Sequence, residues 1–143
     1  GSVKEKQLLD LINEYKKRIQ KYTKIEIIEI PDFSYSVTET LKSEANLILK
    51  HIDTKDYVIT LEIDGKELCS IELSEKIRTT FITNSNITFI IGGSYGLDDS
   101  IKKISNFSLS FSKLTFPHQL FRLILLEQIY RSFKIINNES YHK

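Results

Sequence analysis

The chain has 143 residues, of which 41% are hydrophobic and 27% charged, and its formal net charge is +1. This length fits a single domain over residues 1–143 with a sizeable core, and so small a net charge excludes binding to nucleic acid through overall charge alone. Cys69 is the only cysteine, which excludes an internal disulfide. The sequence has neither an apolar run long enough to span a bilayer nor a signal-peptide pattern, so we expect a cytoplasmic protein.

The first half of the sequence alternates helical and strand patterns. Apolar residues recur at spacings of three and four in the helical stretches, and isoleucine-rich or β-branched runs mark the strands. The sequence predicts a helix over residues 4–22, a strand over Lys24–Ile30 that ends at Pro31-Asp32, a helix over Thr38–His51 and a strand over Tyr57–Ile63. Asp64-Gly65 then predicts a turn.

The second half continues the alternation. The sequence predicts a helix over Ser70–Thr83, strands over Ile87–Ile91 and Phe107–Phe111, a short helix over Leu97–Ser105, and a last helix from Pro117 to Ile136. Ile87–Ile91 is short, continuous and rich in β-branched residues, which is typical of a strand buried on both faces. Alternating strands and helices favour an α/β fold with a mostly parallel sheet and helices on both faces.

The last predicted helix is apolar around most of its circumference. A helix that packs on a single core needs only one apolar stripe, so a second apolar side needs a second partner. We therefore expect this helix to lie in a homodimer interface.

Paired glycines follow the predicted strand at Ile87–Ile91. Gly92 and Gly93 lie where ligands bind in parallel α/β sheets, outside the carboxyl ends of the strands, and glycine lets a ligand approach the backbone closely. A tight strand-to-helix turn without a ligand explains Gly92–Gly96 equally well. The pattern matches neither GxGxxG nor a P-loop.

The segment Ser110–His118 leaves the sheet through hydroxyl residues and enters the last helix at Pro117. Its backbone amides and carbonyls suit a flat heterocycle such as adenine, which Phe111, Leu114 and Phe116 would enclose. The alternative is a capped helix start with Ser112 or Thr115 as the cap.

The C-terminal tail Tyr141-His142-Lys143 combines an aromatic ring, an imidazole and a cation, a mixture that suits base stacking and phosphate contact. A frayed terminus is the alternative. Arg122 belongs to the basic C-terminal group of residues that we expect to contact RNA. The three scattered histidines and one cysteine match no zinc-binding spacing, so we expect no metal site.

Together these segments resemble one family. The order YVITLEIDGK, FIIGGSYGL, LSFSKLTFPHQLFRLILLEQIYRSFKI and a terminal YHK is similar to the RlmH-type methyltransferases of the SPOUT class, over nearly the whole chain. The resemblance implies a C-terminal trefoil knot, a homodimer, S-adenosylmethionine as cofactor, and methylation of N3 of a pseudouridine in 23S ribosomal RNA on the assembled ribosome. Matching motifs place the cofactor against Leu61, Gly92, Phe111, Ser112, Lys113, Leu114, Thr115 and Phe116.

The resemblance also implies that Tyr141, His142 and Lys143 reach the target nucleotide beside the partner subunit's cofactor. We expect His118 or His142 to accept the N3 proton, because imidazole titrates near neutral pH. The family begins with a hydrophobic strand that has no counterpart before Gly1-Ser2, so that strand appears missing here. Two alternatives stay open: a non-catalytic ribosome- or RNA-binding protein on this fold, and a methyltransferase that acts on another RNA such as tRNA.

Overall fold

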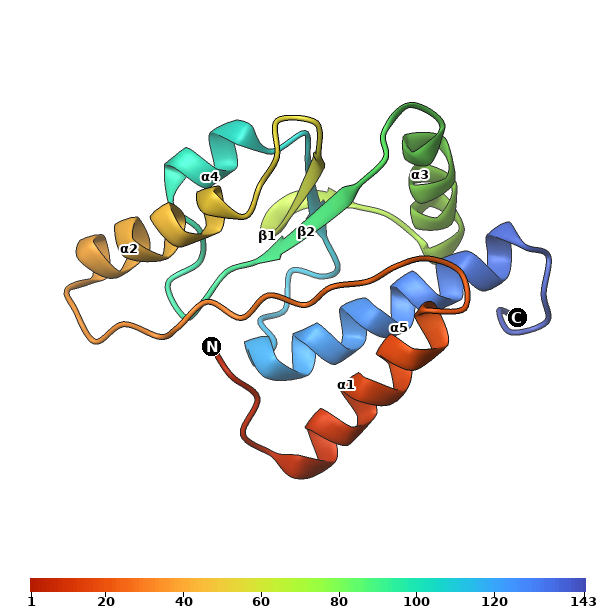
Figure 1. Cartoon of the computed structure of the whole chain (residues 1–143), viewed down its shortest axis with the longest axis horizontal. Coiled ribbons are helices and arrows are strands. Elements are labelled where there is room, and N and C mark those ends of the chain that lie inside the picture. The colour runs from red at the N-terminus through yellow and green to blue at the C-terminus, as the bar shows by residue number, and fades with distance from the viewer.

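The computed structural model describes residues 1–143 and contains five helices and three strands (Figure 1). In chain order they are α1 (Lys6–Ile19), α2 (Val37–Lys50), β1 (Tyr57–Glu67), α3 (Ser70–Thr83), β2 (Ile87–Ile91), α4 (Asp99–Ile104), β3 (Phe107–Ser110) and α5 (His118–Ile136). The predicted bounds of α3 and β2 are confirmed, and the other helices and β3 begin or end within a few residues of their predicted bounds. None of these helices is both long and apolar enough to cross a membrane.

The three strands form one parallel sheet in the order β2-β1-β3, which confirms the α/β class. Ile59 of β1 lies opposite Phe89 of β2 and Phe107 of β3, so β1 is the central strand. Ile87–Ile91 packs on both faces, with Ile90 in one core and Phe89 against the other, but its predicted full burial is confirmed only for Ile90. The reason is position, because β2 forms an edge of the sheet and has a strand neighbour on one side only.

Helices cover both faces of the sheet, as predicted (Figure 1). Ile59 and Leu109 join α1, α3 and α5 in the larger core on one face. Val58 and Ile90 point the other way and pack with α2 and α4 in a smaller core. The alternation of Val58 and Ile59 between the two cores is the period of two that a strand imposes on its side chains.

Helix α5 packs against α1 on one side and against α3 on the other. Tyr22, just beyond α1, stacks on Phe133 with ring centroids 5.6 Å apart, and Phe81 of α3 stacks on the same ring at 6.5 Å. The second partner that the apolar circumference of α5 requires is therefore α1 of the same chain. The apolar circumference of α5 is therefore not by itself evidence for a homodimer.

The predicted strand at Lys24–Ile30 is wrong. These residues lie between α1 and α2 and form no strand, and their backbone makes no backbone hydrogen bond. A cavity of about 620 Å³ separates them from the edge strand β2, and it is lined by Ile25 and Ile27 on one side and by Phe89 on the other. A strand requires a hydrogen-bonding neighbour, and the alternation in this segment has no such neighbour within reach.

Strand β1 contains a bulge that shapes the site. Leu61 and Lys66 both lie opposite Leu109 of β3, so the four residues between them are displaced from the ladder. Gly65 makes this possible, because a Cβ there would lie 2.8 Å from the backbone carbon of Leu109. The predicted turn at Asp64-Gly65 is thus an interruption within one long strand.

Candidate active site

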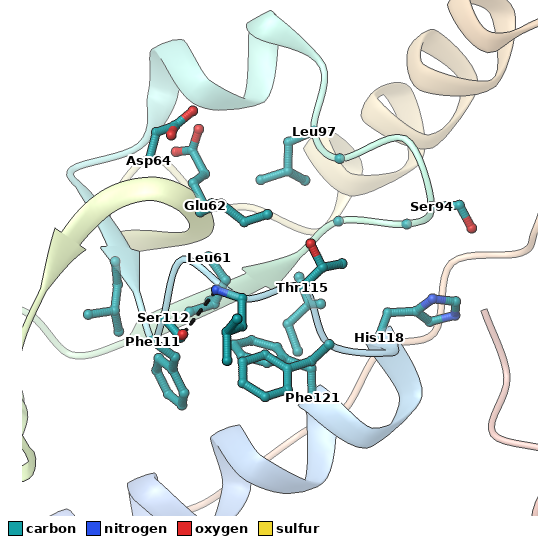
Figure 2. Close-up of a pocket in the computed structure, with 18 of the residues that line it drawn as sticks. Leu61, Glu62, Asp64, Ser94, Leu97, Phe111, Ser112, Thr115, His118 and Phe121 are labelled. Carbon is teal, nitrogen blue, oxygen red and sulfur yellow. Dashed lines mark hydrogen bonds between the residues drawn. The ribbon is translucent and has the colours of Figure 1, made fainter.

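A cavity of about 390 Å³ opens at the carboxyl ends of all three parallel strands (Figure 2). Its wall is made by the bulge after Leu61 of β1, by the loop from Ile91 to Leu97 after β2, and by the loop from Phe111 to Phe116 after β3. This is the edge at which ligands bind in parallel α/β sheets. The volume lies within the ordinary range for small-molecule sites, about 300–1,000 Å³.

The loop after β2 is closed too tightly for any side chain at Gly92. A Cβ on Gly92 would lie 2.6 Å from the carbonyl oxygen of Gly96. Gly96 itself has a φ of +80°, a conformation that glycine adopts without strain, and its N–H donates to the Gly93 carbonyl at 3.1 Å. The glycines therefore bring backbone rather than side chains to the wall of the cavity.

The loop after β3 is ordered by its own hydroxyl groups. The Ser110 hydroxyl donates to the Ser112 carbonyl at 3.1 Å, and the Ser112 hydroxyl accepts from the Leu114 N–H at 3.0 Å. Helix α5 has no side-chain cap, so the interpretation of Ser112 or Thr115 as a helix cap is wrong. The hydroxyl of Ser112 instead fixes the loop that encloses one side of the cavity.

Aromatic rings form the apolar floor of the same cavity. Phe111 lies edge to face with Phe121 at 5.0 Å between ring centroids (Figure 2). Phe116 stacks on Phe121 at 6.0 Å. Leu114 is 70% exposed at the rim. Seven of the eight residues expected at the cofactor line this cavity, namely Leu61, Gly92, Phe111, Ser112, Leu114, Thr115 and Phe116. Lys113 is exposed and is not part of the lining.

A polar wall contributes two carboxylates that sequence reasoning missed. Glu62 and Asp64, displaced by the β1 bulge, lie side by side at one end of the cavity (Figure 2). Glu62 accepts hydrogen bonds from Thr60, at 2.8 Å, and from Ser108. Glu62 lies within TLEI and Asp64 directly after it, and this position near the end of a predicted strand was the signal that would have found them, since strand ends meet at this edge.

His118 begins α5 and lines the cavity from the opposite side, next to the Ser94 loop (Figure 2). Glu44 of α2 lies behind Gly93, and burial raises the pKa of its carboxyl group. Arg122 is one turn further along α5, where it pairs with Glu29 at 3.0 Å and donates to the Gly1 carbonyl at 2.8 Å. Contact of Arg122 with RNA would therefore have to replace these bonds.

The C-terminal tail is folded back on α5, so the alternative of a frayed end is wrong. Asn138 turns the chain with a φ of 53°. Glu139 then accepts from Tyr22 at 2.9 Å and from Lys134 at 2.7 Å. Tyr141 packs edge to face on Tyr130 with centroids 5.0 Å apart.

Beyond that turn, three side chains of the tail and α5 form one network, which we call the tail cluster: Glu127, Arg131 and Tyr141, with His142 attached. Glu127 Oε1 accepts from Arg131 Nη2 at 2.6 Å and from the Tyr141 hydroxyl at 3.1 Å. Burial, then hydrogen bonding with Tyr15 and Glu127, raise the pKa of the Tyr141 phenol, so it stays protonated. Lys143 is exposed.

The cavity lies at the N-terminal end of α5, and the tail cluster contacts the same helix further along, at Glu127 and Arg131. These two residues follow His118 by 9 and 13 positions, which at 1.5 Å per residue is about 14 and 20 Å along the helix axis. The structure thus brings His118 to the cavity and keeps Tyr141, His142 and Lys143 away from the cavity of their own chain. No group of three or more histidine, cysteine, aspartate or glutamate side chains is arranged to hold a metal ion.

Comparison with known proteins agrees with this fold. The family model described as "Predicted SPOUT methyltransferase" matches residues 1–142. A protein of Methanococcus maripaludis named "Putative ribosomal RNA large subunit methyltransferase H" is 56% identical, over all of this chain and 95% of its own length. The "Ribosomal RNA large subunit methyltransferase H" of Clostridium botulinum is 48% identical over the same shares of each chain. The chain therefore belongs to the SPOUT methyltransferase family and is of the RlmH type.

Proposed function

We propose that this protein transfers a methyl group from S-adenosylmethionine to N3 of a pseudouridine in 23S ribosomal RNA on the assembled ribosome. The observation that carries the proposal is the cavity at the strand ends, whose wall is built from the two loops singled out by the family motifs. The names of the relatives support ribosomal RNA of the large subunit as the substrate. We place the activity in the cytoplasm, because ribosomes are assembled in that compartment.

The residues of the cavity fit the proposed cofactor. Gly92 has no Cβ, so the backbone there can approach a ligand closely. Any other residue would place a Cβ against the Gly96 backbone. Phe111 and Phe116 supply the apolar surface that a purine ring prefers, and the carboxylate of Asp64 complements positive charge on the ligand, whereas Glu62 pairs with Lys102 at 3.8 Å. These residues would hold the cofactor, with its adenine against the loop after β3.

S-adenosylmethionine supplies an electrophilic methyl group on its sulfonium, which needs no further activation. The protein therefore acts by orientation, and near-attack geometry contributes roughly 7–11 kcal/mol to lowering the barrier. The cavity walls exclude water from one side of the bound methyl donor. The opposite side must be closed by the RNA and by the residues that position the target ring.

We propose that the tail of a second copy provides those positioning residues, in a homodimer that uses α5 in its interface. Tyr141 and His142 contact α5 at Glu127 and Arg131, roughly 14 to 20 Å along the helix from its cavity end, and neither lines the cavity of its own chain. In a symmetric dimer each tail can meet the partner's cavity instead. The trefoil knot, the first strand of the family and the role of residues 1–143 as one methyltransferase domain stay predictions with this proposal.

The test is methyl transfer to isolated large ribosomal subunits, followed by mass spectrometry of the nucleosides. The proposal predicts methylpseudouridine in 23S ribosomal RNA, and its loss when S-adenosylmethionine is omitted. Binding of the cofactor measured by calorimetry separates the alternatives. Absence of cofactor binding would favour a non-catalytic RNA-binding protein. Methylation of tRNA but not of ribosomal subunits would show that the substrate is another RNA.

A further inference from the structure

One contact in the tail cluster determines which ring nitrogen of His142 carries the proton. Arg131 Nη1 lies 3.2 Å from His142 Nδ1. The guanidinium is fixed from two other sides, since Glu127 accepts from its Nη2 and Nε at 2.6 and 3.1 Å and the Tyr141 ring lies 4.8 Å from its centre. The nitrogen that faces His142 is therefore held in place rather than free to rotate away.

A guanidinium has five N–H donors and no acceptor. In the contact with Arg131, Nδ1 of His142 must then accept through its lone pair. Neutral imidazole carries a single proton, so that proton is on Nε2. The tautomer of His142 thus follows from the identity of its neighbour.

We infer that Arg131 is a positioning residue that holds His142 as the Nε2–H tautomer, so that His142 donates a hydrogen bond to the target pyrimidine and does not accept its proton. This inference rests on the proposed function for its substrate. It replaces the earlier expectation that His142 acts as the base, because the nitrogen that would accept a proton is occupied by Arg131.

The donor role fits the charge that the reaction develops. The N3–H proton leaves to water, and a methyl group then forms the new bond to N3 as the bond from carbon to the sulfonium sulfur breaks and its electron pair returns to sulfur. Between these events the imide is an anion with its charge on N3, O2 and O4. A donor placed at O2 or O4 stabilises this anion, and preorganised donors of that kind contribute roughly 100- to 1,000-fold in rate.

The first test reads the tautomer without any activity. A long-range proton–nitrogen NMR spectrum of the full chain, at a pH where His142 is neutral, should show Nε2 protonated and Nδ1 unprotonated. The Arg131→Met variant should show both tautomers. Arg18→Met is the matched control, because Arg18 also lies over Tyr130 but does not contact His142, and it should leave the signals unchanged. A proton on Nδ1 in the unaltered protein would overturn the inference.

The second test uses side chains that mimic one imidazole nitrogen each. The amide nitrogen of glutamine reaches the position of Nε2, and that of asparagine the position of Nδ1. His142→Gln should retain methyl transfer within about tenfold of the unaltered protein, while His142→Asn and His142→Ala lose at least about 100-fold. Equal loss in all three variants would overturn the donor role.

These outcomes are separable from failure of the proposed function. Cofactor binding should be unchanged in every His142 variant, since His142 contacts Arg131 and is not part of the cavity lining. If the unaltered protein transferred no methyl group at all, the proposed function would fail, yet the NMR spectrum would still decide the tautomer.

Discussion

Two regions along α5 are built in opposite ways. At its N-terminal end, three strand-end loops present backbone and apolar rings around a cavity, to which the β1 bulge and Lys102 add charge. Along its C-terminal half, the tail cluster is a network of side chains on one helix surface. The first construction suits recognition of a small flat ligand, and the second suits orientation of a reacting base. Neither region carries both, which is why we propose that a complete site is shared between two chains.

The largest effect should come from Gly92→Ala at the cavity end. The new Cβ would lie 2.6 Å from the Gly96 carbonyl oxygen, and the loop would have to move away from the cavity wall. We expect at least about 100-fold weaker binding of S-adenosylmethionine, measured by calorimetry, because backbone contacts at the ligand would be lost. Gly93→Ala is the control, since its Cβ meets only the end of the Glu44 side chain, at 3.2 Å. Nearly equal cofactor binding by both variants would contradict the proposed contact between the Gly92 backbone and the cofactor.

Glu127→Gln should sharpen the comparison at the tail end. The change removes the charge that fixes Arg131 and leaves Tyr141 with a weaker acceptor. We expect kcat to fall about 10- to 100-fold with cofactor affinity unchanged, as expected for a group that acts only in positioning. Glu14→Gln is the matched control, because Glu14 pairs with Arg18 at the same spacing on α1. An effect on cofactor binding as large as that on kcat would mean that the two ends are not independent.

A smaller effect is expected from Asp64→Asn in the polar wall of the cavity. Removing one carboxylate reduces the attraction for a cationic ligand, so the sulfonium cofactor should bind about three- to tenfold more weakly. S-adenosylhomocysteine lacks the sulfonium charge and should lose less. Calorimetry with both ligands makes this comparison, and an equal loss would show that Asp64 does not respond to the sulfonium.

The smallest effect is a loosening of the tail in acid. Hydrogen bonding with Lys134 lowers the pKa of Glu139 below its ordinary value of 4.5. The carboxylate form is therefore favoured in the folded tail, and this stabilisation is present above pH 4.5 and is lost as the pH falls through the lowered pKa. NMR signals of Tyr141 should shift toward those of a free tail on acidification, and Glu139→Gln should show the shifted signals already at neutral pH. A tail in Glu139→Gln that stays folded would contradict this prediction.

Local patterns predicted most of the helices and strands, because periodicity reports which face of an element is buried. The strand at Lys24–Ile30 failed because pairing depends on a neighbour that no local pattern reveals. The edge position of β2 and the bulge after Leu61 were missed for the same reason, since both arise between strands.

The candidate site was likewise predictable from the sequence only in part. The loops that contain Gly92 and Ser112 follow strands in the sequence, so their convergence at one sheet edge was predictable. The contact of Arg131 with His142 was not, because it requires the turn at Asn138 that brings the tail back along α5. The distance from the tail cluster to the cavity also became clear only in three dimensions.

The most direct test of a site shared between two chains is mixing two inactive variants. Gly92→Ala removes the cavity and His142→Ala removes the tail function, so each homodimer should be inactive. In a mixed dimer, one of the two sites combines an intact cavity with an intact tail from the other chain. Dissociating and reassociating equal amounts should therefore restore about a quarter of the methyl transfer to large ribosomal subunits, as expected for random pairing. Activity that stays at the level of the separate variants, although mixed dimers are present, would contradict a site built from two chains.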